Sequence, residues 1–260
     1  MKIGSVPYLN AKPLIWGLHR DPGVDMTFEV PSRLAVMLRG GELAAGMVSS
    51  VACFLNPSLQ IAPGMSIASN GPVKSVKLFH NGPVASIQSV ALDTSSLASV
   101  LLSKIILSEA YGLTPEFVDM PPAVPDMLDA CDAAVVIGDT TMRVHEGTYP
   151  ELDLGEEWHK LTGLPFVYAV WAVNPDLASP ALVDILQRSK AYGIERFAEI
   201  SESEAVRLDL PYEVCFRYLS EIMDYDLTER HLQGLNLFRE KARRLGFVSG
   251  DHELRLYEPG

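Results

Sequence analysis

Short apolar segments alternate with amphipathic segments along the first two thirds of the chain. Residues 2–7 (KIGSVP), 26–31 (MTFEVP) and 44–50 (AAGMVSS) have the length and composition of strands. Helical spacing separates them at residues 14–20 and 32–43, with Ser32 in the position of an N-cap and glycines at the end of the second helix. This β-α-β-α-β order predicts a parallel sheet with helices on its faces.

A second series of the same kind follows. Strands are expected within residues 87–96 (IQSVALDTSS), 114–120 and 133–141, and helices over residues 100–112 and 125–131. Two series of comparable size predict an α/β protein of two lobes, each a mainly parallel sheet flanked by helices.

Two apolar, extended segments bounded by Gly and Pro, residues 71–80 and 163–173, are suited to strands that pass between the lobes. We therefore expect a discontinuous first lobe of residues 1–80 and 172–260, an inserted second lobe of residues 81–171, and a ligand cleft between them. From residue 179 onward the periodicity is helical. The last long helix is expected within residues 227–246, with Asp226 or Thr228 at its start and Gly246 at its end.

Charge and composition narrow the possible partners. The 260 residues include 33 acidic and 21 basic side chains, a net charge of −12, which disfavours binding to nucleic acid or to an anionic membrane. No window approaches 18 consecutive apolar residues, and MKIGSVPYL lacks the apolar run of a secretory signal, so we expect a cytoplasmic protein. The three cysteines are far apart among apolar neighbours and are expected to be reduced and buried.

Polar residues gather where the predicted strands lead into helices. In open parallel sheets, ligands bind outside the carboxyl ends of the strands, where hydroxyls and unpaired helix N–H groups can hold carboxylates or phosphates. Taken singly, each of these residues is better explained as a helix N-cap; their shared location weakens that explanation for the set and favours an anion site. They are Ser5, Asn10, Ser49, Ser50, Thr94, Ser95, Ser96, Gly138, Asp139 and Thr140.

Other chemistry finds little support. The patterns GxGxxG, GxxxxGK[ST] and GxSxG are absent, which disfavours dinucleotide binding, P-loop hydrolysis and a common serine-hydrolase site. The six histidines have no metal-like spacing, so we expect no metal site.

Five segments together carry a resemblance: SVPYLNAKPLIWGL, GPVKSVKLF, SVALDTSSLASVLL, DAAVVIGDTT and DLGEEWHKLTGLPFVYAVWAV. In this order the chain resembles the chorismate dehydratase (MqnA) family of the futalosine route to menaquinone. The resemblance implies a two-lobed fold like the type II periplasmic binding proteins. It also implies a hydro-lyase that removes water from chorismate, a dicarboxylate, to give 3-[(1-carboxyvinyl)oxy]benzoate without a cofactor. The related dihydroxynaphthoate synthase shares the fold but has a different first loop.

The family's functional residues fall on Asn10 in SVPYLN and Ser75 in GPVKS, which the resemblance implies are catalytic. Among the loop residues, we expect six to bind substrate: Ser5, Ser49, Thr94, Ser95, Gly138 and Asp139. No general base is evident, which leaves the substrate's own enolpyruvyl carboxylate or Asp139 to take the proton. Because fold does not fix function, a non-catalytic binding protein for a small carboxylate remains the alternative.

Overall fold

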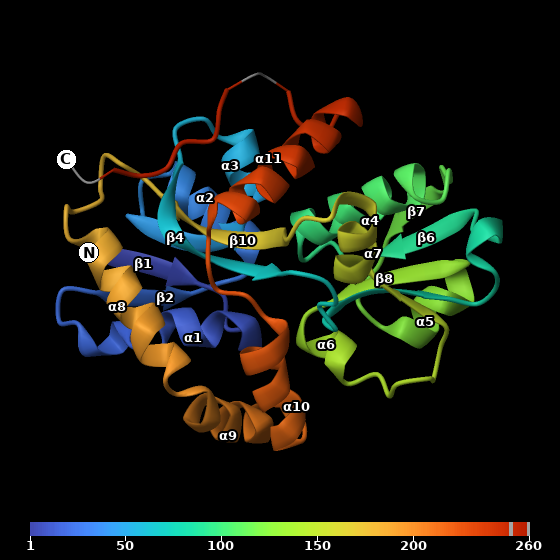
Figure 1. Ribbon diagram of the computed structural model, residues 1–260, viewed down its shortest axis with the longest axis horizontal. Coiled ribbons are helices and arrows are strands. Elements are labelled where there is room, and N and C mark those ends of the chain that lie inside the picture. Colours follow the sequence, from blue (N-terminus) through green and yellow to red (C-terminus); the bar gives the residue numbers. More distant parts are fainter. Residues whose placement is uncertain (250–251, 259–260) are drawn as a thin grey trace.

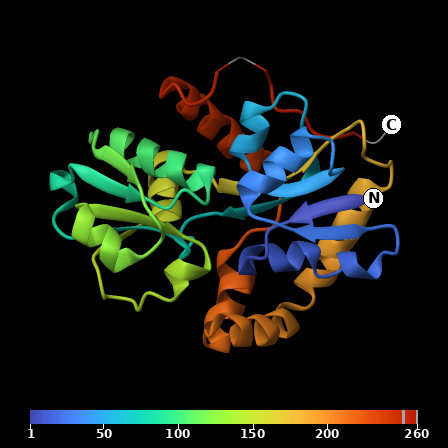
Figure 2. The same ribbon diagram turned by 180° about the vertical axis from the view of Figure 1, so that it is seen from behind.

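The protein consists of two lobes joined by two passes of the chain, in a computed structural model that describes residues 1–249 and 252–258 (Figures 1 and 2). Each lobe contains one five-stranded sheet with helices packed on it. The fold is α/β, as expected from the alternation of strands and helices.

The sheet of lobe one has the strand order β2-β1-β3-β10-β4. The pairs β1–β2 and β1–β3 are parallel, whereas β10 is antiparallel to both of its neighbours. Four of the five strands therefore run in one direction. Strand β10 comes last in the sequence and runs in the opposite direction, between β3 and β4. Their bounds are β1 Lys2–Ser5, β2 Asp25–Phe28, β3 Ala45–Ser49, β4 Gln60–Ser69 and β10 Phe166–Val173.

The sheet of lobe two repeats this plan with the order β7-β6-β8-β5-β9. Its parallel strands are β6, β7 and β8, and β5 runs antiparallel between β8 and β9. Both sheets thus have one reversed strand, β10 in the first sheet and β5 in the second. The bounds are β5 Val76–His80, β6 Ser89–Leu92, β7 Glu116–Asp119, β8 Ala133–Ile137 and β9 Glu151–Asp153.

Helices cover both sheets and continue into a C-terminal helical region, where α8 packs on α1 and α11 packs on both β10 and α4 (Figure 1). In lobe one they are α1 Lys12–Ile15, α2 Pro31–Arg39 and α3 Val51–Leu55, and in lobe two α4 Leu97–Glu109, α5 Val124–Ala130, α6 Asp139–Met142 and α7 Leu154–Thr162. The C-terminal helices are α8 Leu182–Ile194, α9 Phe197–Leu208, α10 Tyr212–Arg217 and α11 Glu229–Arg244. Short 3-10 turns lie at Leu9–Ala11 (η1), Leu18–Arg20 (η2) and Val84–Ser86 (η3), and a π-helical turn lies at Tyr218–Ile222 (η4).

The chain crosses between the two sheets at other residues than the lobe boundaries expected from the sequence. Strand β5 belongs to the second sheet and β10 to the first, so the chain crosses at residues 70–75 and 163–165. The boundaries expected at residues 80 and 172 are thus about one strand too late. Both strands are buried on both faces, so their apolar pattern carries no sign of which sheet they join. We propose the two crossing segments as the limits of the lobes.

Two further elements differ from expectation. The ten-residue strand β4 has no counterpart in the sequence analysis, because Pro63 and Gly64 interrupt its apolar pattern. Helix α2 begins at Pro31 after Val30, so Ser32 lies inside the helix and is not its cap. Proline at the first position of a helix lacks only an N–H that would have no helical partner. By contrast, Thr228 caps α11 as expected.

An aromatic cluster closes the junction between the lobes on the side of α11. Phe166 of β10 contacts Phe238 of α11 at a ring distance of 4.7 Å and Trp158 of α7 at 5.2 Å. A Cβ at Gly234 of α11 would lie 2.2 Å from the Pro165 carbonyl oxygen, so only glycine lets the helix approach the second crossing this closely. The lobes therefore share one continuous core on this side.

Candidate active site

A cavity of about 70 Å³ lies between the lobes at the carboxyl ends of β1, β3 and β8. The two sheets place there five of the eight site residues expected from the sequence: Asn10, Ser49, Ser75, Ser95 and Gly138. Tyr8, Tyr168, Ser96 and Ser99 also line it, together with apolar side chains of both lobes. Its polar lining consists of hydroxyls, an amide and backbone groups, with no charged side chain among the residues that line it.

Asn10 lies in the 3-10 turn η1 that follows β1. Its Oδ1 atom is buried and has no hydrogen-bond partner within the protein. A buried acceptor without a partner loses the hydrogen bonds that water would give it, so the site favours a ligand that donates a hydrogen bond there. Asn10 thus lines the cavity and carries an acceptor that no group of the protein uses.

Ser75 ends the first crossing segment and is held by its backbone on both sides. Its N–H donates to Val73 O at 2.7 Å, and its carbonyl accepts from Gly138 N at 2.7 Å. The preceding residue, Lys74, has φ 62°, a left-handed conformation that is strained for a residue with a side chain. Ser75 therefore sits in a fixed, strained turn at the edge of the cavity.

Asp153, which is far from this turn in the sequence, stabilises it by direct contact. Its carboxylate accepts from Val73 N at 3.0 Å and from Lys74 N at 2.7 Å. The same carboxylate is the N-cap of α7, accepting from Gly155 N at 3.0 Å and Glu156 N at 3.1 Å. One side chain thus joins the start of α7 to the turn that carries Ser75, a role the sequence analysis does not assign.

Tyr218 is a second residue that the sequence analysis misses. It opens the π-helical turn η4, is buried, and its hydroxyl lies 2.8 Å from Ser75 Oγ. Burial raises the pKa of the Tyr218 hydroxyl, hydrogen bonding with Ser75 and Asn10 opposes that change, and the negative charge of Asp139 adds to it. The phenol is therefore neutral at physiological pH and keeps a proton to donate.

Gly138 connects β8 to α6 with φ 68° and ψ −151°, a region that glycine alone adopts readily. A Cβ on Gly138 would meet no atom within 4 Å, so the α-carbon faces open space at the cavity. The GDTT motif thus places backbone rather than a side chain beside Ser75.

Serines of both lobes meet at the start of α4. Ser49 Oγ, at the end of β3, accepts from Ala98 N at 3.1 Å across the cleft. Ser96 caps the same helix through Ser99 N, and Ser95 donates to Asp93. Ser49 therefore accepts the hydrogen bond of Ala98 N–H, a donor that could also bind a ligand carboxylate.

Three of the expected site residues are not among those that line this cavity. Ser5 is buried and donates to its neighbour's carbonyl, Val6 O, at 3.3 Å, and Thr94 is exposed. Asp139 points toward lobe one, where it accepts weakly from Leu9 N at 3.4 Å and lies 3.5 Å from Arg207. Burial raises the pKa of Asp139, although Leu9 N–H and Arg207 favour its charged form. This carboxylate joins the two lobes beside the cavity.

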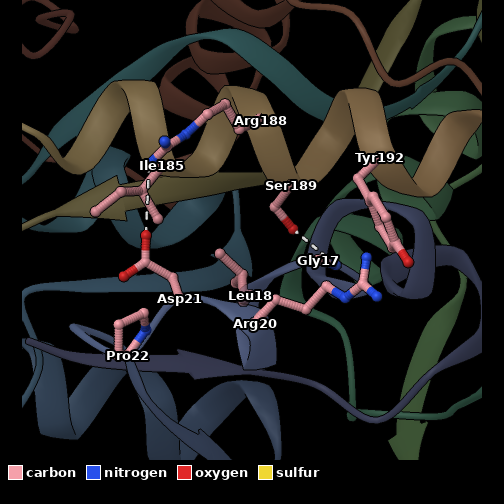
Figure 3. A pocket seen from close by; sticks show the side chains of 9 residues that line it. All are labelled: Gly17, Leu18, Arg20, Asp21, Pro22, Ile185, Arg188, Ser189 and Tyr192. Carbon is pink, nitrogen blue, oxygen red and sulfur yellow. Dashed lines mark hydrogen bonds and ion pairs between the residues drawn. The ribbon is translucent and has the colours of Figure 1, made fainter.

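Two other hollows lie outside it. A wide groove of about 980 Å³ runs between residues 141–146 and 209–222 on the far side of Tyr218, with Lys74, Lys77, Arg143 and Arg217 among its lining residues. On lobe one, a hollow of about 370 Å³ lies between η2 and α8 (Figure 3). In it Arg188 pairs with Asp21 at 3.4 Å and Ser189 Oγ accepts from Gly17 N at 3.2 Å, so these polar groups are bound to one another.

Among the described residues, no cluster of three or more His, Cys, Asp or Glu side chains is arranged to hold a metal ion. The three cysteines are free and buried. Within the described part of the chain, no helix is both long and apolar enough to cross a membrane.

Comparison with known proteins places the chain in a family. A family model described as menaquinone biosynthesis matches residues 1–244. The chain belongs to this menaquinone biosynthesis family. Within it, the chain is 33% identical over 257 residues to the chorismate dehydratase of Thermus thermophilus, covering 92% of this chain and 93% of that protein.

The architecture is also that of solved structures. Protein AF1704 from Archaeoglobus fulgidus superposes with a TM-score of 0.77 at 19% identity, covering 95% of this chain and 98% of that one. The periplasmic aliphatic sulphonate binding protein SsuA from Escherichia coli superposes with a TM-score of 0.70 at 15% identity, covering 100% and 92%. This member of the menaquinone biosynthesis family therefore has the two-lobed fold of periplasmic binding proteins.

Proposed function

We propose that this protein is a chorismate dehydratase, a carbon–oxygen hydro-lyase that converts chorismate to 3-[(1-carboxyvinyl)oxy]benzoate. The observation that carries the proposal is the meeting of Asn10 and Ser75 at one cavity between the lobes, in a chain 33% identical to a chorismate dehydratase over almost its full length. The site offers neutral hydrogen-bond donors and acceptors, which suit a substrate with two carboxylates and a hydroxyl.

The reaction removes one proton and one hydroxide, which leave as water. The proton comes from the ring carbon that carries the enolpyruvyl ether, and the electron pair of that C–H bond delocalises through the diene to the ring carboxylate. The C–O bond of the neighbouring hydroxyl then breaks, and the ring becomes aromatic. Besides a base for the proton, such a step needs groups that stabilise the developing charge and hold the leaving hydroxyl in line.

The base that takes the proton is proposed to be the substrate's own enolpyruvyl carboxylate. Asp139, the protein alternative, is turned to Leu9 N and Arg207 and does not line the cavity. None of the six histidines lines it either. The protein's part would be to orient the two ends of chorismate so that the carboxylate reaches the ring C–H.

The start of α4 is proposed to bind one carboxylate. Ser49 Oγ accepts from Ala98 N, and Ser95, Ser96 and Ser99 surround the same helix end. A substrate carboxylate would replace Ser49 as the acceptor and would gain the positive end of the helix dipole. Ser5, Thr94 and Asp139 keep a proposed role only if lobe movement brings them to the ligand.

Substrate entry requires the lobes to separate. The cavity of about 70 Å³ is below the range of ligand pockets, which begins at roughly 300 Å³. Opening at residues 70–75 and 163–165 would widen it.

Two alternatives share this fold: a non-catalytic carboxylate-binding protein and the dihydroxynaphthoate synthase. The likeness to SsuA at 15% identity concerns the fold and adds nothing in favour of either. The cytoplasmic location expected from the sequence stays a prediction.

The test is to incubate the purified protein with chorismate and to follow chorismate and products by liquid chromatography with mass detection. Loss of one water with formation of the carboxyvinyloxy benzoate is expected, without added metal or nucleotide. Chorismate that binds but stays intact would support a binding protein instead. Chorismate that neither binds nor reacts would contradict both.

A further inference from the structure

Tyr218 lies where the two proposed catalytic residues meet. Its hydroxyl is 2.8 Å from Ser75 Oγ, and the turn η1 that carries Asn10 packs against the π-helical turn η4 that Tyr218 begins. Tyr218 comes from the C-terminal helical region, Asn10 from the first loop and Ser75 from the first crossing. Three distant parts of the chain thus converge on one phenol oxygen.

The turn itself is unusual. Met223 N donates to Tyr218 O at 3.0 Å, the i to i+5 pattern of a π-helix, directly after the regular helix α10. Such turns are rare and cluster at functional sites, because they rotate a side chain away from the position a continuous helix would give it. Here the Tyr218 hydroxyl lies beside Ser75, a residue that lines the cavity.

Either hydroxyl of the Tyr218–Ser75 pair can donate in their hydrogen bond. Asn10 Oδ1 has no partner, so the Asn10 carboxamide can act on Tyr218 only as a donor, through Nδ2. The arrangement that uses the single phenol proton is the one in which the phenol oxygen accepts from Asn10 and donates to Ser75 Oγ. Ser75, having accepted, keeps its own O–H free for the cleft.

We propose that Tyr218 is a positioning residue that links Asn10 to Ser75 and holds Ser75 so that its own O–H is the donor offered to the cavity. The proposal rests on the proposed function in that the matching ligand group at Ser75 is a carboxylate oxygen. Chains of hydrogen bonds polarise one another, which strengthens the last donor in the chain. Without the phenol O–H, Ser75 would be free to turn its own proton away from the ligand.

Tyr218→Phe removes the hydroxyl and keeps the ring. The kcat for chorismate should fall by about 10-fold to 100-fold, with KM changed by less than about 3-fold, because the lost effect acts on charge that develops during the reaction. Tyr225→Phe is the matched control, since Tyr225 is also buried and its hydroxyl has no hydrogen-bond partner. It should keep wild-type kcat.

A double variant separates positioning from a general loss of structure. If Tyr218 acts through Ser75, then Ser75→Ala with Tyr218→Phe should be no slower than Ser75→Ala alone. Wild-type kcat in Tyr218→Phe, or losses that multiply in the double variant, would overturn the proposal.

A second cycle needs no substrate. The melting temperatures of the two single variants and the double variant should be non-additive, because either single change breaks the same hydroxyl pair. Additive shifts would overturn the link itself. No turnover of chorismate by the wild type would overturn the proposed function alone, since the melting cycle would still decide whether the two hydroxyls are coupled.

Discussion

The Asp153 carboxylate accepts a 2.7 Å hydrogen bond from the backbone N–H of Lys74, the residue directly before Ser75. The two residues lie at the end of β9 and in the first crossing segment, far apart in sequence. The bond holds Lys74 in its left-handed conformation and thereby sets the position of Ser75. The strain of this turn is thus offset by one carboxylate.

We expect Asp153→Ala to lower both stability and turnover. Four backbone N–H groups lose their acceptor, which should lower the free energy of unfolding by about 1–3 kcal/mol. Release of the turn should lower kcat by about 10-fold or more, since small displacements of a reacting group are costly. Urea unfolding and steady-state kinetics on the same preparation measure the two effects.

Asp132→Ala is the matched control. Asp132 also accepts from two backbone N–H groups, those of Gln88 and Ser89, and these hydrogen bonds lower its pKa, but it lies outside the cavity. It should lose stability and keep wild-type kcat. Equal kcat in the two variants would contradict a role for Asp153 in placing Ser75.

The sequence predicts those site residues whose position follows from their immediate neighbours in the chain. Asn10, Ser49, Ser95 and Gly138 follow predicted strands, and the carboxyl ends of parallel strands meet at one edge of a sheet. Asp153 and Glu156 carry the spacing of a helix start, which would have predicted the cap of α7. No pattern of neighbouring residues predicts that the same carboxylate also accepts from the N–H groups of residues 73 and 74, because that contact joins the first and the last segments of lobe two.

Tyr218 could not be found in the same way. It lies in a helical segment, among apolar neighbours, where a buried aromatic side chain normally means core packing. Its role depends on the π-helical turn and on two residues from other parts of the chain. The lobe boundaries failed for a related reason, since a strand buried on both faces does not reveal its sheet.

Substitutions of Asn10 test whether the first loop serves the reaction. Asn10→Ala should lower kcat by about 100-fold, and Asn10→Asp should also raise KM, because a carboxylate there repels the carboxylates of the substrate. Kinetics with chorismate and a thermal melt on each variant separate the two effects. Asn174→Ala, which removes a turn residue whose Oδ1 accepts from Asp176 N, should change only the melting temperature. Wild-type turnover in Asn10→Ala would mean that Asn10 only shapes the turn.

The stability contributed by Asp139 should depend on pH. Burial raises the pKa of Asp139 above its ordinary value of 3.8, so the folded state favours the neutral acid. That contribution is complete below the ordinary value and is lost as pH rises through the raised one. Asn in its place stays neutral, so the melting temperature of Asp139→Asn relative to wild type should increase between about pH 4 and pH 7. The exposed Asp129→Asn serves as control, and a difference that does not change with pH would refute the effect.

Gly138→Ala tests the open space beside Ser75. The added methyl group meets no atom of the protein but projects toward the cavity, and the backbone conformation is strained for alanine by about 1–3 kcal/mol. We expect a lower melting temperature and a lower kcat/KM. Gly112→Ala has a similar φ of 67° and open surroundings outside the cavity, so it should lower the melting temperature alone. Equal kinetics in both variants would exclude Gly138 from the site.

The place of β10 between β3 and β4 has a consequence for synthesis on the ribosome. Strand β4 ends at Ser69 and its partner β10 begins at Phe166, so the two are made roughly 100 residues apart. At about 5–20 residues per second, the first sheet waits ~5–20 s with an open slot between two apolar strands. All of lobe two emerges in that interval. An open strand edge invites pairing with other chains, so the nascent protein is most prone to aggregate, and most in need of a chaperone, just before the strand that completes its first sheet appears.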